Sequence, residues 1–226
     1  YAYDALGNLR LKSYTGGVND GREMELTYAG NNRLNFVRDR DAAGNFAFTG
    51  ERWAGHDTRG NIAHWGPAYN GNGVHSVYDM TNRPVYMYGR GLQTNGATYD
   101  LFTQSHLYDA HNRRVKTVED GVVRYNIYDA AGTLVQVYDA TSDTRTDYVS
   151  GPNGALARIK RDAGVDTTSF IHTDHLGTAR AATGTGGNLL WEDFHTPFGE
   201  SLTHPDATDD QGDYTGHIRD KASGLT

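Results

Sequence analysis

The chain of 226 residues contains no cysteine, only five prolines and no long apolar stretch. The absence of cysteine excludes a disulfide framework and any zinc or redox site built on thiolates. No apolar run is long enough to cross a membrane as a helix. Hydrophobic residues make up 37% of the chain, which is thin for two packed sheets, because their inner faces need a dense apolar layer.

Positive charge is also scarce. The net charge is -7, and the densest basic cluster is Arg-Ile-Lys-Arg at residues 158–161. Nucleic-acid-binding domains present a strongly positive face, so we expect no nucleic-acid partner. The sequence opens on Tyr1, inside a repeated phrase and without a starting Met or a signal peptide. We therefore expect a piece of a longer protein.

The most informative feature is that repeated phrase. It consists of a Tyr-Asp pair, two variable residues, Gly or Asn, a polar residue and then an apolar stretch. Self-similarity of this kind indicates an array of small, similar structural units. Clean copies begin at Tyr3, Tyr78, Tyr108 and Tyr128, a weaker copy begins at Tyr28, and copies that lack the Tyr begin at Asp41, Asp57 and Asp174.

The phrase has the chemistry of a hairpin turn. Asp accepts hydrogen bonds from nearby backbone N–H groups and starts a type I turn. Gly or Asn three residues later enters the left-handed conformation at low cost, and the two together form a hairpin with a G1 bulge. We therefore predict a positive φ at the Gly or Asn of each copy. The predicted turn residues are Asp4 and Gly7, Asp41 and Gly44, Asp57 and Gly60, Asp79 and Asn82, Asp109 and Asn112, Asp129 and Gly132, and Asp174 and Gly177.

The segments beside the turns are typical of strands. Residues 33–36 and 45–48 alternate apolar and polar side chains, as half-buried strands do. The sequence therefore predicts an all-β fold of consecutive antiparallel β-hairpins in one curved, spiralling single-layer sheet. Fifteen Tyr are expected to form ring ladders between neighbouring hairpins, so that each unit buries its surface against the next.

The repeated phrases resemble the YD repeats of the RHS (rearrangement hot spot) repeat family. A more specific match lies at residues 171–180 (IHTDHLGTAR), 187–191 (GNLLW) and 197–200 (PFGE), which are similar to the core module near the C-terminal end of RHS shells. Residues 215–217 and 219–225 resemble the next piece of that module. We therefore expect a hairpin strip over residues 1–168 and a core-like segment over residues 169–226, ending before the stretch where family members cut themselves.

The resemblance implies a function. RHS repeats form a hollow shell that often encloses a C-terminal toxin, in bacterial proteins that are secreted or displayed at the cell surface and delivered by a secretion system. It implies that this chain is a non-catalytic segment of the shell, whose partners are the rest of that shell and the enclosed toxin domain.

Two other functions stay open at this stage. One is a module that binds carbohydrate or recognises a cell surface, because exposed rings such as Trp53, Trp65 and Trp191 suit stacking on sugars. The other is one half of a self-cleaving aspartyl site that residues after Thr226 would complete. The direction in which the rings point separates a shell from a sugar-binding groove.

Several residue groups contain side chains or glycines of the kinds found in metal or phosphate sites. His172, Asp174 and His175 are potential metal ligands, but side chains on a hairpin turn need not converge. Gly184 to Gly187 lacks the helix and the Lys of a phosphate-binding loop, which indicates a hairpin tip. The acidic residues Asp206, Asp209, Asp210 and Asp213 do not have the ligand order of an EF-hand.

The potential catalytic groups are equally isolated in the sequence. Ser150 and Ser201 lie in no nucleophile-elbow context. Glu192, Asp193 and Glu200 are candidates for a carboxylate pair, but adjacent strand residues point to opposite faces. We therefore expect no catalytic residue, metal ligand or cofactor.

Overall fold

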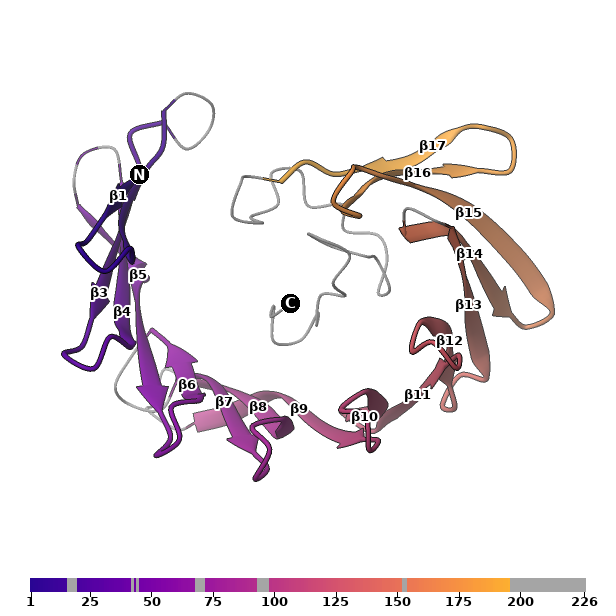
Figure 1. The fold of residues 1–226 in the computed structure, drawn as a ribbon, viewed down its shortest axis with the longest axis horizontal. Helices are drawn as coiled ribbons and strands as arrows, with labels where there is room; N and C mark the ends of the chain where they lie inside the picture. Colours follow the sequence, from indigo (N-terminus) through magenta and orange to yellow (C-terminus); the bar gives the residue numbers. More distant parts are fainter. Residues whose placement is uncertain are drawn as a thin grey trace. The chain divides into compact units, whose positions relative to one another are not determined.

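The computed structural model describes residues 1–15, 20–41, 43, 45–67, 72–92, 98–151 and 154–195. Within these residues the regular elements are seventeen β-strands, and none is a helix. Consecutive strands pair in antiparallel fashion along the chain, as successive hairpins do (Figure 1). The predicted all-β hairpin fold is therefore confirmed.

The chain forms two compact units, Tyr1–Gln104 and Ser105–Thr226. Strand β9 (Thr98–Tyr108) begins in the first unit and ends in the second. The other strands of the first unit are β1 (Ala2–Tyr3), β2 (Leu9–Ser13), β3 (Glu23–Tyr28), β4 (Leu34–Arg40), β5 (Phe46–His56), β6 (Ile62–Gly66), β7 (Gly73–Tyr78) and β8 (Pro84–Leu92). The second unit contains β10 (Arg114–Glu119), β11 (Val122–Tyr128), β12 (Leu134–Asp139), β13 (Thr144–Gly151), β14 (Gly154–Asp162), β15 (Val165–Thr173), β16 (Ala179–Gly184) and β17 (Leu189–Glu192). The strip and core segments expected over 1–168 and 169–226 stay a prediction.

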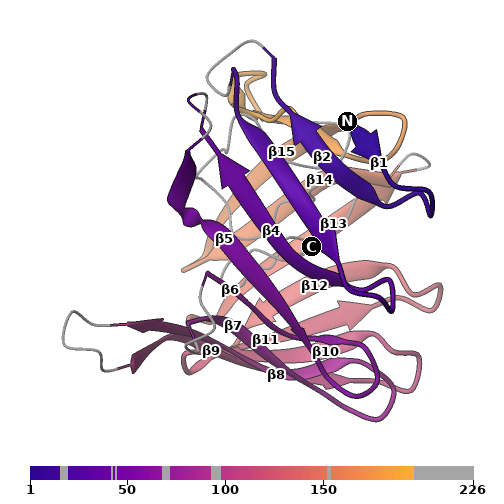
Figure 2. The same cartoon turned by 90° about the vertical axis from the view of Figure 1, so that its left-hand side faces the viewer.

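Each unit is a single layer. A strand packs chiefly against the strands that precede and follow it, and Figure 2 shows β4 and β5 of the first unit side by side in one sheet. No second sheet packs on this layer among the described residues. The low apolar content of the sequence suits this architecture, because a single layer has no sandwich core to fill.

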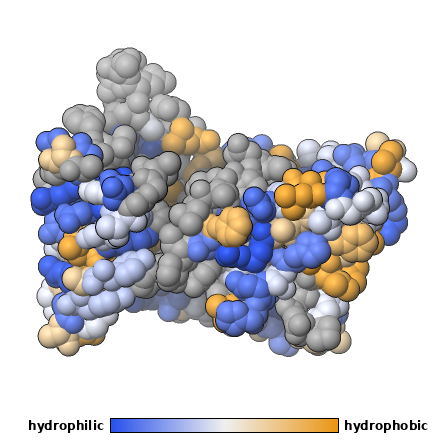
Figure 3. Space-filling view, turned by 90° about the horizontal axis from the view of Figure 1, so that it is seen from above, coloured by the Kyte–Doolittle hydropathy of each residue, from blue (hydrophilic) through white to orange (hydrophobic). Residues whose placement is uncertain are grey.

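The apolar core is small and local. Ile171, Ala182 and Trp191 lie directly opposite one another across β15, β16 and β17, and Ala179 joins them in a buried cluster. Elsewhere, on the surface that Figure 3 presents, hydrophobic residues form small patches among hydrophilic ones. Stability therefore depends on pairs of neighbouring strands more than on one central core.

The ring ladders between strands are more varied than the Tyr content predicts. Tyr125 and Tyr138 stack with ring centroids 6.4 Å apart. In the first unit, however, the ladder runs from His64 through His75 to Tyr88, with centroids 4.6 Å apart at each step. Any flat ring placed opposite another on a sheet makes this contact, so imidazole rings take the same place as phenol rings.

Candidate functional site

The turn at residues 57–61 shows how the repeated phrase folds. The N–H of Asp57 donates to the carbonyl of Asn61 (2.9 Å), and the N–H of Gly60 donates to the carbonyl of Asp57 (3.1 Å). Asp57 Oδ1 accepts the N–H groups of Arg59 and Asn61, both at 2.9 Å. Its Oδ2 accepts the side-chain amide of Asn61 at 2.8 Å. One carboxylate therefore satisfies three donors inside a five-residue turn.

The same pair of backbone hydrogen bonds closes the turns that begin at residues 4, 79, 109, 129 and 174. In the weaker copy, Ala29 replaces Asp and the turn still closes, with φ of 62° at Asn32. Gly44 lies outside the described residues, although Asp41 accepts the N–H of Ala43 at 3.0 Å. The predicted positive φ is confirmed at Gly7, Gly60, Asn82, Asn112, Gly132 and Gly177.

The polar residue that follows the Gly or Asn has a role that sequence reasoning missed. In two copies it is an arginine that binds the turn carboxylate. Arg83 Nε and Nη2 lie 2.7 and 2.6 Å from Asp79 Oδ2, and Arg113 makes the same contacts with Asp109. The Arg83 side chain is the largest factor that holds the pKa of Asp79 well below its usual value. The charged form of this carboxylate is therefore the one that the turn stabilises.

In two copies, the Tyr of the Tyr-Asp pair connects its turn to the strand that follows the preceding turn. Tyr78 donates its hydroxyl to the carbonyl of Ile62 (2.9 Å), and Tyr128 donates to the carbonyl of Arg114 (3.0 Å). Ile62 and Arg114 are each the first strand residue after the previous turn. The guanidinium of Arg113 also lies 5.1 Å from the centre of the Tyr128 ring. The pair therefore joins a hairpin to its neighbour through Tyr and closes its own turn through Asp.

Neighbouring turns also contact each other directly. The Asn8 side-chain amide donates to Asn32 Oδ1 at 2.5 Å, and Asn61 donates to Asn82 Oδ1 at 2.9 Å. The guanidinium of Arg33 lies so close to Gly60 that a Cβ at Gly60 would be 2.7 Å from Arg33 Nη2. In each unit we call the turns at this same end of the strands the turn edge: turns 4–8, 29–33, 57–61 and 79–83 of the first unit, and turns 109–113, 129–133 and 174–178 of the second.

The turn at Asp41 does not belong to the turn edge. Strand β4 lies between turns 29–33 and 41–45, and β5 lies between turns 41–45 and 57–61. Because successive hairpin turns fall at opposite ends of the strands they connect, Asp41 lies at the other edge of the sheet. The phrase is the same at both edges, so its sequence does not separate Asp41 from the other copies.

The potential metal ligands around Asp174 have separate surroundings. Asp174 Oδ1 accepts the N–H groups of Leu176 and Thr178 at 2.9 and 3.0 Å, so it closes its own turn. His172 Nε2 lies 2.9 Å from Thr183 Oγ1 on β16, and His175 is exposed. Within the described residues, no group of three or more His, Cys, Asp or Glu side chains could hold a metal ion.

The other polar candidates are dispersed. Glu192 is exposed, whereas Asp193 is buried and its Oδ2 lies 3.5 Å from Nε2 of His195. No motif in the sequence indicated this Asp–His contact. The N–H of Gly187 donates to the carbonyl of Gly184 at 2.9 Å, as expected for a hairpin tip. Ser201, Glu200, Asp206, Asp209, Asp210 and Asp213 lie outside the described residues.

The three Trp residues do not share a surface. Trp53 lies opposite Gly66, whereas its neighbour Ala54 lies opposite Trp65, so Trp53 and Trp65 are on opposite faces of the sheet. Trp191 is 8% exposed and packs in the apolar cluster. The set of exposed rings that a sugar-binding surface needs is therefore not formed by these residues.

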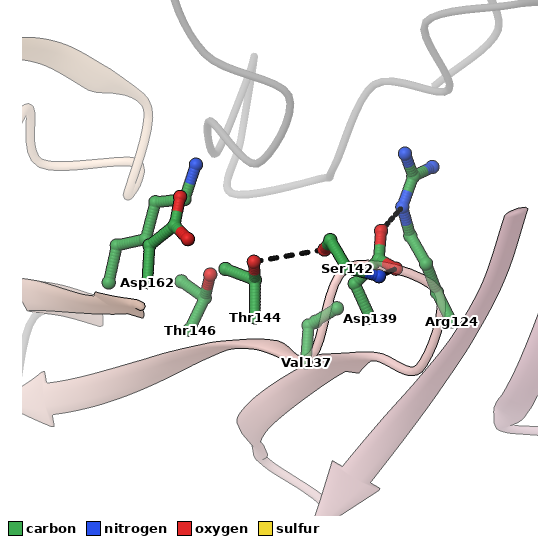
Figure 4. A pocket seen from close by; sticks show the side chains of 8 residues that line it. Arg124, Val137, Asp139, Ser142, Thr144, Thr146 and Asp162 are labelled. Atoms are coloured by element: carbon green, nitrogen blue, oxygen red, sulfur yellow. Dashed lines mark hydrogen bonds and ion pairs between the residues drawn. The ribbon is translucent and has the colours of Figure 1, made fainter. Parts of the chain in front are cut away.

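A polar pocket of about 250 Å³ opens on one face of the second unit (Figure 4). Arg124 Nε lies 3.4 Å from Asp139 Oδ2, and Ser142 Oγ lies 2.9 Å from Thr144 Oγ1. The hydroxyls of Ser142 and Thr144 are therefore bonded to each other, and no imidazole of the described residues lines the pocket to act as their base. The lining residues are Arg124, Val137, Asp139, Ser142, Thr144, Thr146, Lys160 and Asp162.

No protein-family model matches the sequence, and neither does any curated protein. Among solved structures, a chain of the Photorhabdus luminescens Tc holotoxin pore with a TccC3 mutation aligns with 98% of this chain at 12% identity and a TM-score of 0.42. A chain of the TcdB2-TccC3-Cdc42 crystal structure aligns with 99% at 13% identity and a TM-score of 0.42. The alignments span 16% and 17% of those chains. Within the described residues, no helix is long and apolar enough to span a membrane.

Proposed function

We propose that this chain is a wall segment of an RHS-repeat shell, which encloses a C-terminal toxin domain in a bacterial protein that is secreted or displayed at the cell surface. The observation that carries the proposal is the turn edge. Its recurring side chains close turns and join neighbouring hairpins, as in the contacts Tyr128–Arg114 and Asn61–Asn82. Such contacts extend a continuous single-layer strip.

The proposed wall has no catalytic role. Catalysis needs a nucleophile, a base and an orienting group that converge on one point. The turn carboxylates are already bonded to their own backbone, as at Asp57 and Asp174, and two hydroxyls of the polar pocket, those of Ser142 and Thr144, bond to each other. The carbohydrate-binding alternative is less well supported, since Trp53, Trp65 and Trp191 do not line one surface.

The experiment is limited proteolysis of the complete gene product, with cryo-electron microscopy of the same sample. A shell predicts a curved β-wall in the images and a C-terminal region that protease reaches only after denaturation. Gly132→Val should strain one turn of the wall and expose that region, whereas Gly132→Asn should leave it protected, because Asn already occupies this turn position at Asn82 and Asn112. A two-sheet sandwich, or a C-terminal region digested at once in the native protein, would contradict the proposal.

A further inference from the structure

Strand register divides the second unit into two faces of different character. Directly opposed residues share a face, so Val137, Thr146 and Lys160 lie in one row on one side of the sheet. Tyr138, Arg145 and Arg161 form the neighbouring row on the other side. We call the first the pocket face, because it holds the polar pocket, and the second the ring face, because it holds the Tyr125–Tyr138 stack.

The two faces differ in exposure. On the pocket face, Thr146 is 4% and Ser169 is 5% exposed. On the ring face, Ile127 is 45% and Phe170 is 41% exposed. Side chains on the inner side of a curved sheet converge and shield one another, whereas those on the outer side spread apart. The lower exposure of the pocket face is what the inner side of a bend produces.

The chemistry of the faces points the same way. The pocket face is rich in hydroxyls and paired charges, such as Thr144 with Ser142 and Arg124 with Asp139. Its hollow is lined by one apolar side chain, Val137. Around this hollow, a polypeptide held behind the wall meets a hydrated surface; the exposed apolar side chains of the same face, Leu156 and Val165, are not among the residues that line it. Isolated exposed apolar residues on the other side, such as Ile127, are ordinary for an outer surface.

Resting on the proposed function, we infer that the pocket face lines the enclosed space and that the ring face is the outer surface of the shell. Neighbouring residues of a single strand allow the two faces to be compared directly. In β14, Lys160 and Asp162 lie on the pocket face, and Arg161 between them lies on the ring face opposite Asp166. All four side chains are exposed in this structure, so a difference in their accessibility in the complete protein would come from the enclosure.

The test is cysteine accessibility in the complete gene product. The chain has no cysteine, so each variant adds a single thiol to it, and any cysteine elsewhere in the product is first replaced by serine. Lys160→Cys and Arg161→Cys compare two neighbouring cations, and Asp162→Cys and Asp166→Cys compare two carboxylates, with one member of each pair on each face. Each variant is treated with a maleimide that carries a bulky poly(ethylene glycol) chain, and labelling is read as a mass shift before and after denaturation.

We expect Arg161→Cys and Asp166→Cys to label at once in the native protein, and Lys160→Cys and Asp162→Cys to label only after denaturation. The reverse pattern would overturn the inference while leaving the shell itself supported, because one face would still be protected. Rapid labelling of all four variants would contradict the enclosure, and with it the proposed function. Labelling of all four in the denatured state verifies that each thiol is reactive.

Discussion

The hydroxyl of Tyr128 donates a hydrogen bond to the backbone carbonyl of Arg114 at 3.0 Å, across one full hairpin. Tyr78 makes the equivalent bond with Ile62 at 2.9 Å. In both cases the acceptor is the first strand residue after the preceding turn. This relationship explains why Tyr precedes Asp in the repeated phrase, since a shorter or non-polar side chain at this position would not join the two hairpins.

Tyr128→Phe should remove this join and lower the free energy of unfolding by about 0.5–1.5 kcal/mol, the usual net value of one hydrogen bond. Urea unfolding followed by circular dichroism measures the difference. Tyr125→Phe is the matched control, because the Tyr125 ring stacks on Tyr138 and its hydroxyl makes no hydrogen bond among the described residues. Equal losses in the two variants would contradict the assigned role of the Tyr128 hydroxyl.

Gly132→Val should lower the free energy of unfolding by roughly 1–2 kcal/mol, because φ at Gly132 is 88° and a β-branched residue is strained there. Gly132→Asn should cost much less, since Asn tolerates this conformation. Gly60→Asn is expected to cost about as much as Gly132→Asn. A Cβ at Gly60 would lie 2.7 Å from Arg33 Nη2, but this atom is the end of a flexible side chain that can move aside. Thermal unfolding of the three variants gives the order.

The amide contact between Asn61 and Asn82 should couple their mutational effects. Asn61→Ala removes the donor, and Asn82→Gly removes the acceptor while keeping the left-handed backbone. In a double-mutant cycle we expect a coupling energy of about 0.5 kcal/mol, near the lower limit for a hydrogen bond because this one is exposed. Strictly additive effects would mean that adjacent turns do not stabilise each other through this contact.

Acid should weaken the turns only at low pH. The pKa of Asp79 is lowered first by the Arg83 side chain, and that of Asp109 first by the backbone N–H of Arg113. A lowered folded-state pKa contributes stability that is present above the unfolded value of 3.8 and is lost as pH falls through the folded value. Urea midpoints should therefore stay level from neutral pH to about pH 5 and fall below about pH 4.

The double variant Asp79→Asn, Asp109→Asn provides the control for this acid effect. Its two turns no longer carry a titrating carboxylate, so its stability should be lower at neutral pH and should fall less steeply in acid. The variant also loses the salt bridges to Arg83 and Arg113. Because salt screens ion pairs, the loss of stability of the unsubstituted protein at high salt measures the contribution of such pairs separately. A pH dependence as steep as that of the unsubstituted protein would place the acid-sensitive groups elsewhere.

The purified chain should keep its full mass during days of incubation, with or without divalent metal ions. Asp174→Asn should loosen its turn, because Asp174 Oδ1 accepts the N–H groups of Leu176 and Thr178, and no turnover should be lost with it. Intact-mass spectrometry is the measurement. Cleavage at one defined bond that Asp174→Asn abolishes, in a variant that keeps its fold, would place the chain among enzymes.

The sequence predicted what is local and missed what depends on pairing between strands. Asp57 and Gly60 act within five residues, so their types and spacing were enough to predict the turn. The partner of Tyr128 lies fourteen residues away, and its identity depends on strand register. The same is true of Trp53 and Trp65, whose opposite faces follow from the pairing of Ala54 with Trp65. No periodic pattern within one strand carries that information.

The buried contact of Asp193 with His195 escaped prediction for a related reason. These residues follow β17, outside the repeated phrase, so no spacing within that phrase relates them. The position of Asp41 was also not predicted. Its phrase matches the others, although its turn lies at the opposite edge of the sheet. A motif identifies the shape of a turn, and the number of strands between turns decides the edge on which it falls.

Each strand packs chiefly against its two neighbours in sequence. The stability of the sheet is therefore approximately a sum of terms for single hairpins and for contacts between neighbouring hairpins. Adding or deleting one complete hairpin on the turn edge would preserve the type of every remaining contact, from Tyr128–Arg114 to Asn61–Asn82. Gene duplication of a single phrase is thus enough to lengthen the sheet, with no compensating change elsewhere. The capacity of any container built from this sheet is then set by copy number, and it grows in steps of one hairpin.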